Sequence, residues 1–172
     1  MTNFRLIGLP HETFGPLFDL PDAELAARGA MRVVADENPG YPCRVSLEDA
    51  KVGEELLLLP YPHLPENSPY RSVGPIFVRR GATTRELAPG EIPEYVTSRL
   101  MSVRAYDANH LMIGAAVCEG SAVADEIERQ FRREKVAYLH LHNAKPGCFS
   151  CAVRRVGARD RVYPPLRGEG TP

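Results

Sequence analysis

Short runs of apolar residues, separated by segments rich in proline, glycine, asparagine and aspartate, dominate the hydrophobic pattern of this chain. Such runs predict strands. They recur at residues 4–7, 31–34, 55–59, 76–79, 100–106, 111–118, 136–142 and 149–156. The runs 100–106 and 111–118 flank a four-residue segment whose residues tolerate unusual φ angles, so these two are expected to form a hairpin.

Helical periodicity is clearest after Ser121, which we expect to be an N-cap. Val123, Ile127 and Phe131 recur four residues apart, and charged residues occupy the positions between them. This spacing places the three apolar side chains on one face and predicts an amphipathic helix.

Shorter helical segments are expected elsewhere. Pro21 suits the first turn of a helix over residues 21–28, and Gly29 suits the position after its end. Ser46 resembles the start of a capping box and predicts a helical turn over 47–50. One further turn is expected within 89–98, whereas the four prolines of segment 60–72 predict a loop.

Strands therefore follow one another along most of the chain, with two or three short helices between them. This order predicts an α+β fold with a mainly antiparallel β-sheet and argues against a doubly wound parallel sheet. A chain of 172 residues fits one domain. We expect that domain to span residues 1–165, followed by a flexible C-terminal tail over 166–172.

The composition removes several classes of function. The formal net charge is −1, which gives no support to nucleic-acid binding. No apolar run approaches the ~20 residues of a membrane-spanning helix, and the N-terminus lacks the pattern of a signal peptide. A cytoplasmic location without nucleic-acid or membrane partners is expected, with the four cysteines as free thiols, ligands or catalytic groups. The pattern predicts neither a cofactor nor an oligomeric state.

The segment 138–151 holds two of the five histidines and two of the four cysteines. Side chains alternate between the faces of a strand, so His140 and His142 share one face with Tyr138, opposite the leucines between them. A five-residue loop over 143–147 then pairs His142 with Cys148. Directly opposed residues have Cβ atoms ~5 Å apart.

The same register pairs His140 with Ser150. It places Cys151 and Phe149 on the leucine face, so that the two cysteines of the segment lie on opposite sides of the sheet. A redox Cys-x-x-Cys motif normally opens a helix, and no helix is predicted after Cys151.

Four interpretations of the segment follow. In the first, Cys148 is a nucleophile with His142 as its base and His140 beside them. In the second, both histidines bind zinc together with Cys148 and Cys151, although the spacing matches no common zinc pattern. The third is the redox motif. The fourth is a polar sheet face without chemistry.

Other candidates lie in loops. Cys43 is flanked by Arg44, whose guanidinium can activate a thiol, but a small buried side chain explains Cys43 as simply. Cys43 can also meet Cys148 as a disulfide or redox pair. The proline-stiffened segment around Tyr70 carries Arg71, which can hold a carboxylate or phosphate, and also His63.

These residues resemble a bacterial family of unknown function, the DUF1203 proteins. The resemblance extends from the strand at Phe4 to Arg155 and rests on the segments 42–47, 53–54, 68–71, 76–78, 104–107 and 140–148, together with Ala50. It implies family positions at Cys43, Arg71, His140, His142, Asn143 and Cys148, but not at Cys118 or Cys151. It implies no known activity, cofactor or partner.

The expected function is a small-molecule site, for an anionic ligand, built on the hairpin between His140 and Cys148. An enzyme would use Cys148, His142 and His140 for catalysis, and no metal is assigned to it. The ligand-binding candidates are Arg71, Tyr70, His63, Asn143 and Cys43. The alternatives are a non-catalytic interaction module that uses segment 61–72 and a metal-binding protein that uses the His/Cys cluster.

Overall fold

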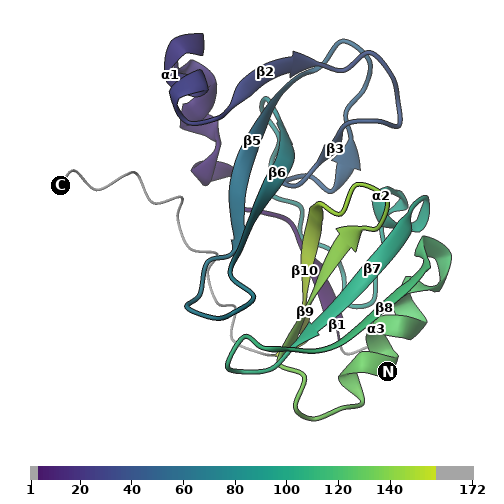
Figure 1. The fold of residues 1–172 in the computed structure, drawn as a ribbon. Coiled ribbons are helices and arrows are strands. Elements are labelled where there is room, and N and C mark those ends of the chain that lie inside the picture. Colours follow the sequence, from purple (N-terminus) through teal and green to yellow (C-terminus); the bar gives the residue numbers. More distant parts are fainter. Residues whose placement is uncertain (1–3, 158–172) are drawn as a thin grey trace.

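The computed structural model describes residues 4–157, which form two five-stranded β-sheets, one above the other in Figure 1. Sheet A has the strand order β1-β10-β9-β7-β8, and all its pairs are antiparallel. Its strands are β1 (Phe4–Ile7), β7 (Leu100–Tyr106), β8 (Met112–Glu119), β9 (Tyr138–Asn143) and β10 (Phe149–Arg155).

Sheet B has the order β2-β5-β6-β3-β4, and only its β3–β6 pair is parallel. Its strands are β2 (Met31–Val34), β3 (Pro42–Cys43), β4 (Glu48–Asp49), β5 (Glu55–Leu64) and β6 (Ser72–Arg79). The predicted α+β class with mainly antiparallel pairing is confirmed. The strands are divided between two sheets, which strand patterns alone do not specify.

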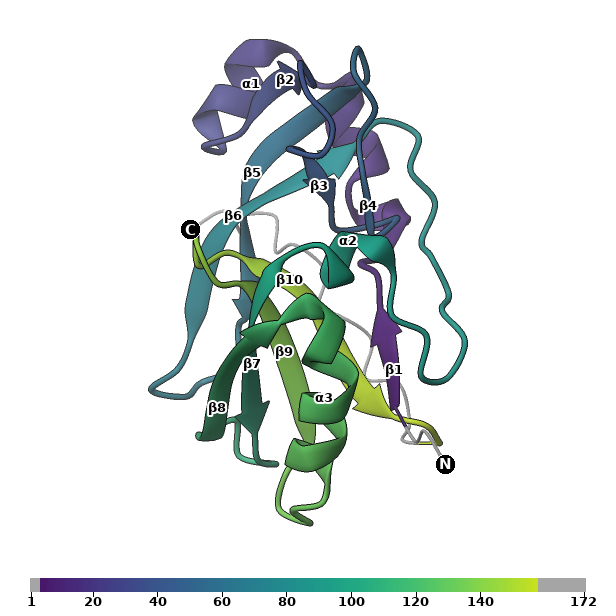
Figure 2. The ribbon, with the colours of Figure 1, turned by 90° about the vertical axis from the view of Figure 1, so that its right-hand side faces the viewer.

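Short helices connect and cover the sheets. The α-helices are α1 (Asp22–Ala27), α2 (Glu94–Thr97) and α3 (Val123–Phe131), and the 3-10 helices are His11–Thr13, Gly15–Asp19 and Gly120–Ala122. Figure 2 shows α3 lying across one face of sheet A. Val123, Ile127 and Phe131 are buried there, as their spacing predicts. Ser121 does not cap α3, because a 3-10 turn precedes it and Ala122 occupies the N-cap.

Two large hydrophobic clusters hold the sheets in place. The first fills the space between sheet A and its helices and includes Val103, Leu139 and Leu141. The second joins one face of sheet B to the N-terminal 3-10 helices and α1. Phe149 and Ala152 of β10 belong to this second cluster. The centre of sheet A is therefore buried on both faces, and β9 is buried along its whole length, whereas the edge strand β8 is partly exposed.

Strand β5 runs five residues beyond its predicted end and includes Pro60 and Pro62. Its partner β2 pairs with it only as far as Leu58. Beyond that point β5 pairs with β6 alone. A proline there has no backbone N–H, but no second strand needs a hydrogen bond from it. The predicted loop over 60–72 therefore begins only after Leu64.

The predicted helical turn over 47–50 is wrong. Residues 44–47 form a turn, and Glu48–Asp49 pair antiparallel with Pro42–Cys43 as β4. Leu47 has a φ of +52°, in the left-handed region, which reverses the chain and stops a helix from propagating.

The predicted tail over 166–172 lies outside the described residues. Within residues 4–157, no helix combines the length and the apolar character that crossing a membrane requires.

The approach of Gly120 to the end of α2 gives a test of the packing. A Cβ at Gly120 would collide with the carbonyl oxygens of Val96 and Arg99, whereas a Cβ at Gly15 would meet nothing within 4 Å. Gly120→Ala is expected to lower the free energy of unfolding by about 1–3 kcal/mol. Gly15→Ala, the matched control, is expected to stay within about 0.5 kcal/mol of the wild type. Equal urea midpoints for the two variants would contradict this packing.

Candidate functional site

The hairpin between β9 and β10 has a loop one residue shorter than the sequence pattern predicts. The Asn143 N–H donates to the Cys148 carbonyl across 2.9 Å, and the Gly147 N–H donates to the Asn143 carbonyl across 2.8 Å. Gly147 has a φ of +78°, which glycine adopts without strain. Cys148 therefore lies opposite Asn143, and His142 lies opposite Phe149. The predicted pairing of Cys148 with His142 is wrong.

A β-bulge at Ser150 then changes the register again. Pairing passes from Phe149 opposite His142 to Cys151 opposite Leu141, with Ser150 as the extra residue. Cys151 consequently packs in the leucine cluster, as predicted. Phe149 lies on the histidine face instead, because the bulge separates its parity from that of Cys151.

An open pocket of about 650 Å³ lies where the tip of this hairpin meets sheet B. Cys148 and Asn143 line it from the hairpin, and the pocket is partly apolar. Its lining also includes Pro39, Gly40, Pro42, Arg44, Leu58, Pro75, Phe77, Ser98, Arg99, Leu100, Glu119, Lys145 and Pro146. The volume lies within the range of small-molecule sites, roughly 300–1,000 Å³.

Arg44 connects the two sheets at this pocket. It stands in the turn after β3 and is only 1% exposed. Its Nε donates to the Phe149 carbonyl across 2.8 Å, its Nη1 to the Pro42 carbonyl across 2.5 Å, and its Nη2 to the Cys148 Sγ across 3.0 Å. Among the described residues, no carboxylate bonds Arg44. Its positive charge therefore faces two carbonyl oxygens and one thiol.

Asn143 approaches the same sulfur. Its Nδ2 lies 3.6 Å from the Cys148 Sγ. Its Oδ1 is buried, and no hydrogen-bond partner for it exists among the described residues. Cys148 thus has two N–H donors around its sulfur, and Asn143 keeps one acceptor for a further partner.

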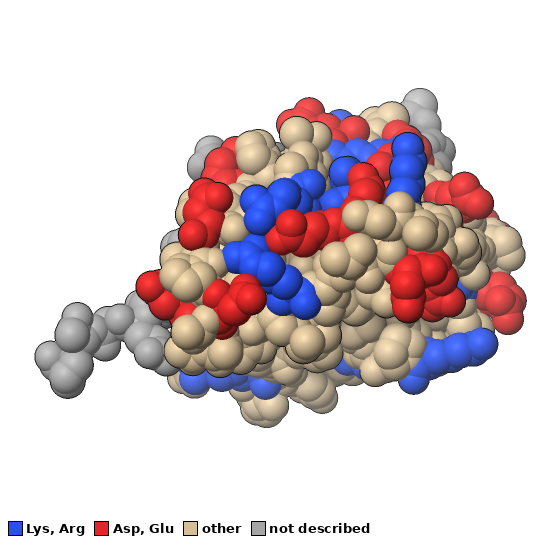
Figure 3. Space-filling model, turned by 90° about the horizontal axis from the view of Figure 1, so that it is seen from above, with Lys and Arg blue, Asp and Glu red and all other residues tan. Residues whose placement is uncertain are grey.

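The other charged side chains of the pocket differ in whether a neighbouring residue already pairs with them. Arg99 is held by both oxygens of Asp49, at 2.9 and 2.5 Å, and by the Tyr95 carbonyl. Lys145 is exposed, and within residues 4–157 it makes no ion pair or hydrogen bond through its side chain. Glu119 is the one carboxylate in the described lining. Figure 3 shows a face on which basic and acidic side chains alternate, without a continuous basic patch.

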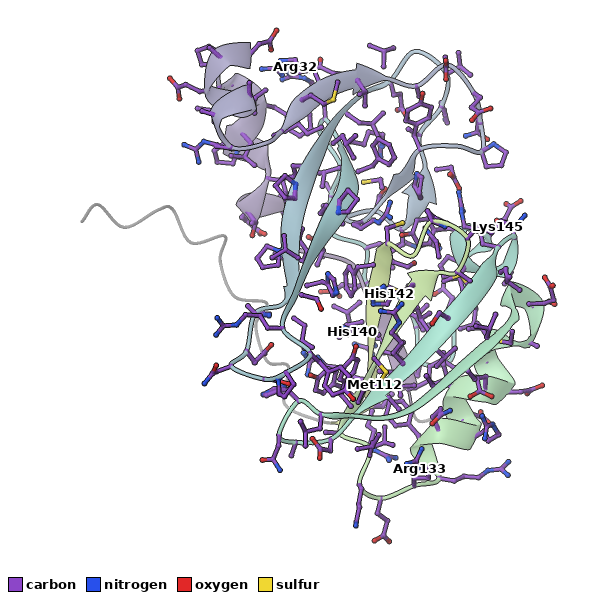
Figure 4. All side chains as sticks on the ribbon, in the orientation of Figure 1. Arg32, Met112, Arg133, His140, His142 and Lys145 are labelled. Carbon is purple, nitrogen blue, oxygen red and sulfur yellow. The ribbon has the colours of Figure 1, made fainter. Side chains whose placement is uncertain are left out.

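The histidines form a separate cluster between the sheets. The ring centroid of His63, from β5, lies 5.1 Å from that of His142 and 6.1 Å from that of His140. Phe149 stacks on the His63 ring at 5.4 Å. Ala152, not Ser150, lies opposite His140. Figure 4 shows His140 and His142 at the centre of the molecule and Lys145 apart from them at the hairpin tip.

All three rings are neutral near pH 7. Burial, reinforced by the positive charge of Arg104, lowers the pKa of His63 to about 4. Burial lowers the pKa of His142 to about 3, against the opposing effect of its hydrogen bond to Gly147. The pKa of His140 lies well below its ordinary value, chiefly through burial. Because a carbonyl only accepts, the His142 Nδ1 carries the proton and donates to the Gly147 oxygen across 3.0 Å.

The cluster does not have the arrangement of a metal centre. Within residues 4–157, no group of three or more histidine, cysteine, aspartate or glutamate side chains is placed to hold a metal ion. The four residues of the zinc interpretation do not converge either, because Cys151 lies in the leucine cluster on the other face of sheet A from His140 and His142.

Comparison with family models decides the family. The model described as protein of unknown function (DUF1203) matches residues 40–155, more than half of the chain. The chain belongs to the DUF1203 family. Comparisons with curated proteins and with solved structures found no match. The resemblance inferred from the sequence began at Phe4, whereas the match begins at residue 40.

The DUF1203 match contains the histidine cluster and the whole pocket lining except Pro39. The candidates Cys148 and Asn143 meet in the pocket, and His63, His140 and His142 meet in the cluster. No hydrogen bond joins His142 to Cys148 in the described part of the chain. The role of His142 as a base for Cys148 therefore has no contact to support it.

Three other candidates lie elsewhere. Arg71 donates its Nε to the Glu66 carbonyl within its own loop, and Tyr70 packs edge-on against Tyr106 with centroids 6.4 Å apart. Cys43 is fully buried in the second cluster, and its sulfur accepts the Arg79 N–H at 3.3 Å. None of the three lines the pocket.

Arg44 is the residue that sequence reasoning undervalued. The sequence indicates a role for Arg44 only beside its neighbour Cys43, yet its side chain reaches Cys148, 104 residues away. The signal in the sequence was a charged residue directly between two apolar ones, Cys43 and Val45.

The neutral histidines predict acid sensitivity. Each folded-state pKa lies below the ordinary value of 6.5, so the unfolded chain binds more protons between that value and about 4. The contribution of the neutral rings to the free energy of unfolding is complete above about pH 6.5 and is lost as the pH falls. The free energy of unfolding, measured by urea titration, is expected to decrease from about pH 7 to about pH 5.

Glutamine variants separate this effect from other titrations. His140→Gln and His142→Gln are each expected to reduce the proton uptake on unfolding by up to about one proton. His11→Gln, at an exposed position, serves as the control. A pH slope that survives substitution of His63, His140 and His142 together would show that other groups cause it.

Proposed function

We propose that the pocket between the two sheets binds an anionic small molecule and that Cys148 is its nucleophile. One observation carries the proposal. Arg44 is 1% exposed, has no carboxylate partner among the described residues, and places its Nη2 3.0 Å from the Cys148 Sγ in the pocket wall.

The charge of Arg44 supports a reactive sulfur. A guanidinium stays protonated in proteins, and burying a charge is costly unless an opposite charge or hydrogen bonds compensate it. Two of its three acceptors are neutral carbonyl oxygens. The Cys148 sulfur is the one acceptor that can become an anion. The thiolate, which is the nucleophilic form of cysteine, would neutralise Arg44.

The surroundings of the sulfur suit a ligand more than a structural thiol. The Asn143 Oδ1 is a buried acceptor without a partner, so a donor group of a ligand could bond it. Lys145 offers an unpaired positive charge among the described residues at the mouth of the pocket. Leu58 and Phe77 supply apolar wall. A ligand with an apolar body and an anionic group matches this lining.

The histidine face has a supporting role in this proposal. The His142 Nδ1–H holds the Gly147 carbonyl, and Gly147 directly precedes Cys148. His142 thus fixes the backbone that presents the sulfur. An interaction module that uses segment 61–72 remains a prediction, and no contact of Tyr70 or Arg71 favours it over the pocket.

Alkylation tests the proposal. The native protein is treated with iodoacetamide near neutral pH, and the modified cysteines are identified by peptide mass mapping. Cys148 is expected to react at least about tenfold faster than the same cysteine in the urea-denatured chain, because the guanidinium stabilises the thiolate. Arg44→Gln is expected to remove most of this advantage, and Asn143→Ala a smaller part.

The other cysteines supply the controls. Cys118 is partly buried on β8, and Cys43 and Cys151 are buried. Labelling of these three should stay as in the wild type when a variant remains folded, and a rise would reveal unfolding. A native Cys148 that reacts no faster than the denatured cysteine, or equally fast in folded Arg44→Gln, would refute the proposal.

A further inference from the structure

The pocket presents a single thiol. The Cys43 sulfur lies in the core and accepts the Arg79 N–H, Cys151 is 1% exposed in the leucine cluster, and Cys118 packs against that cluster from β8. Cys148 is the only cysteine in the described pocket lining. A disulfide formed by Cys148 in this pocket would therefore join it to a thiol from outside the chain.

The groups around Cys148 restrict the chemistry. Hydrolysis of an amide or ester requires a proton donor for the leaving group. The partners of the Cys148 sulfur are a guanidinium and an amide N–H, and no histidine or carboxylate bonds it in the described residues. Attack of a thiolate on a disulfide needs no general acid or base, because the leaving group departs as a thiolate.

Arg44 also defines the charge of the partner. Once the Cys148 sulfur is bonded to another sulfur, it can no longer be an anion, and the buried guanidinium loses its counter-charge. A carboxylate on the attached group would restore it. Lys145 favours the same charge at the mouth of the pocket, since Asp49 already neutralises Arg99.

We infer that the pocket carries out thiol–disulfide exchange with a low-molecular-weight disulfide that bears carboxylates. The inference rests on the proposed function of Cys148. The Cys148 thiolate attacks one sulfur of the disulfide R–S–S–R, and a new Cys148–S–S–R bond forms. The old sulfur–sulfur bond breaks, and its electron pair leaves with R–S⁻. Cys148 is oxidised, and one R–S group is reduced.

Three disulfides of different charge test the inference on the reduced full-length protein. Oxidised glutathione is anionic, bis(2-hydroxyethyl) disulfide is neutral, and cystamine is cationic. Adduct formation at Cys148 is followed by intact mass and peptide mapping. Each rate is divided by the rate of 2-mercaptoethanol with the same disulfide, which removes the intrinsic differences in reactivity. The normalised rates are expected to fall from anionic to neutral to cationic, by at least about tenfold overall, and salt should compress the range.

Lys145→Glu provides the matched variant. This residue is exposed, so the substitution is expected to leave the fold intact. It should lower the ratio of the anionic rate to the neutral rate severalfold, since the substitution acts on the charge of the disulfide. Lys135→Glu makes the same change of net charge at an exposed position after α3 and should alter neither rate.

The outcomes separate the two proposals. If Cys148 alkylates rapidly in an Arg44-dependent way but prefers the neutral or cationic disulfide, the anionic class is wrong and the nucleophile stands. If Cys148 is unreactive toward iodoacetamide and all three disulfides, both proposals fail. If exchange ends in a Cys43–Cys148 disulfide, the single-thiol argument is wrong.

Discussion

The buried guanidinium of Arg44 is the constraint on which the arrangement of this DUF1203 protein depends. Arg44 belongs to the turn that follows β3 in sheet B, yet it bonds the Phe149 carbonyl and the Cys148 sulfur in the hairpin of sheet A. A charge with 1% exposure has to be satisfied by its neighbours. The two hydrogen bonds that join the sheets, to the Phe149 carbonyl and the Cys148 sulfur, therefore also position the sulfur beside a positive charge.

The two groups of candidate residues have opposite electrostatic character. The histidine cluster buries neutral rings, which pack against Phe149 much as aromatic side chains do. Arg104 lies opposite His140 on the neighbouring strand β7, and its charge opposes protonation of the rings. That positive environment disfavours a bound cation. In the pocket, by contrast, the positive charges face a group that can become negative. The histidines pack between the sheets, whereas the proposed chemistry rests on the cysteine.

Much of the fold could be predicted from the sequence. Local periodicity was sufficient for β1, β7 and α3, because each buries one face in the first cluster. The bounds of β2 were also predicted, although Met31 and Val34 at its ends are exposed. Periodicity failed where pairing decides the structure. Pro60 and Pro62 stay in β5 because β2 has already ended, and Leu47 turns the chain into β4 through a left-handed φ. Neither cause is visible in a run of residues.

The candidate site could be predicted only in part. Strand alternation separated Cys151 from the histidines correctly, but a loop one residue shorter placed Cys148 opposite Asn143 instead of His142. A one-residue slip moves a side chain to the other face of a strand. The contact between Arg44 and Cys148 spans 104 residues and depends on how the two sheets meet, so no local pattern contains it.

A double-mutant cycle of Arg44→Gln and Cys148→Ala, read as free energies of unfolding near neutral pH, tests the pairing of these two side chains most directly. If the sulfur is the counter-charge of the buried guanidinium, the two losses are not additive. The coupling energy should then be about 1–3 kcal/mol, since either single substitution removes the same interaction. Additivity within about 0.5 kcal/mol would show that Arg44 does not depend on Cys148 and would contradict the account.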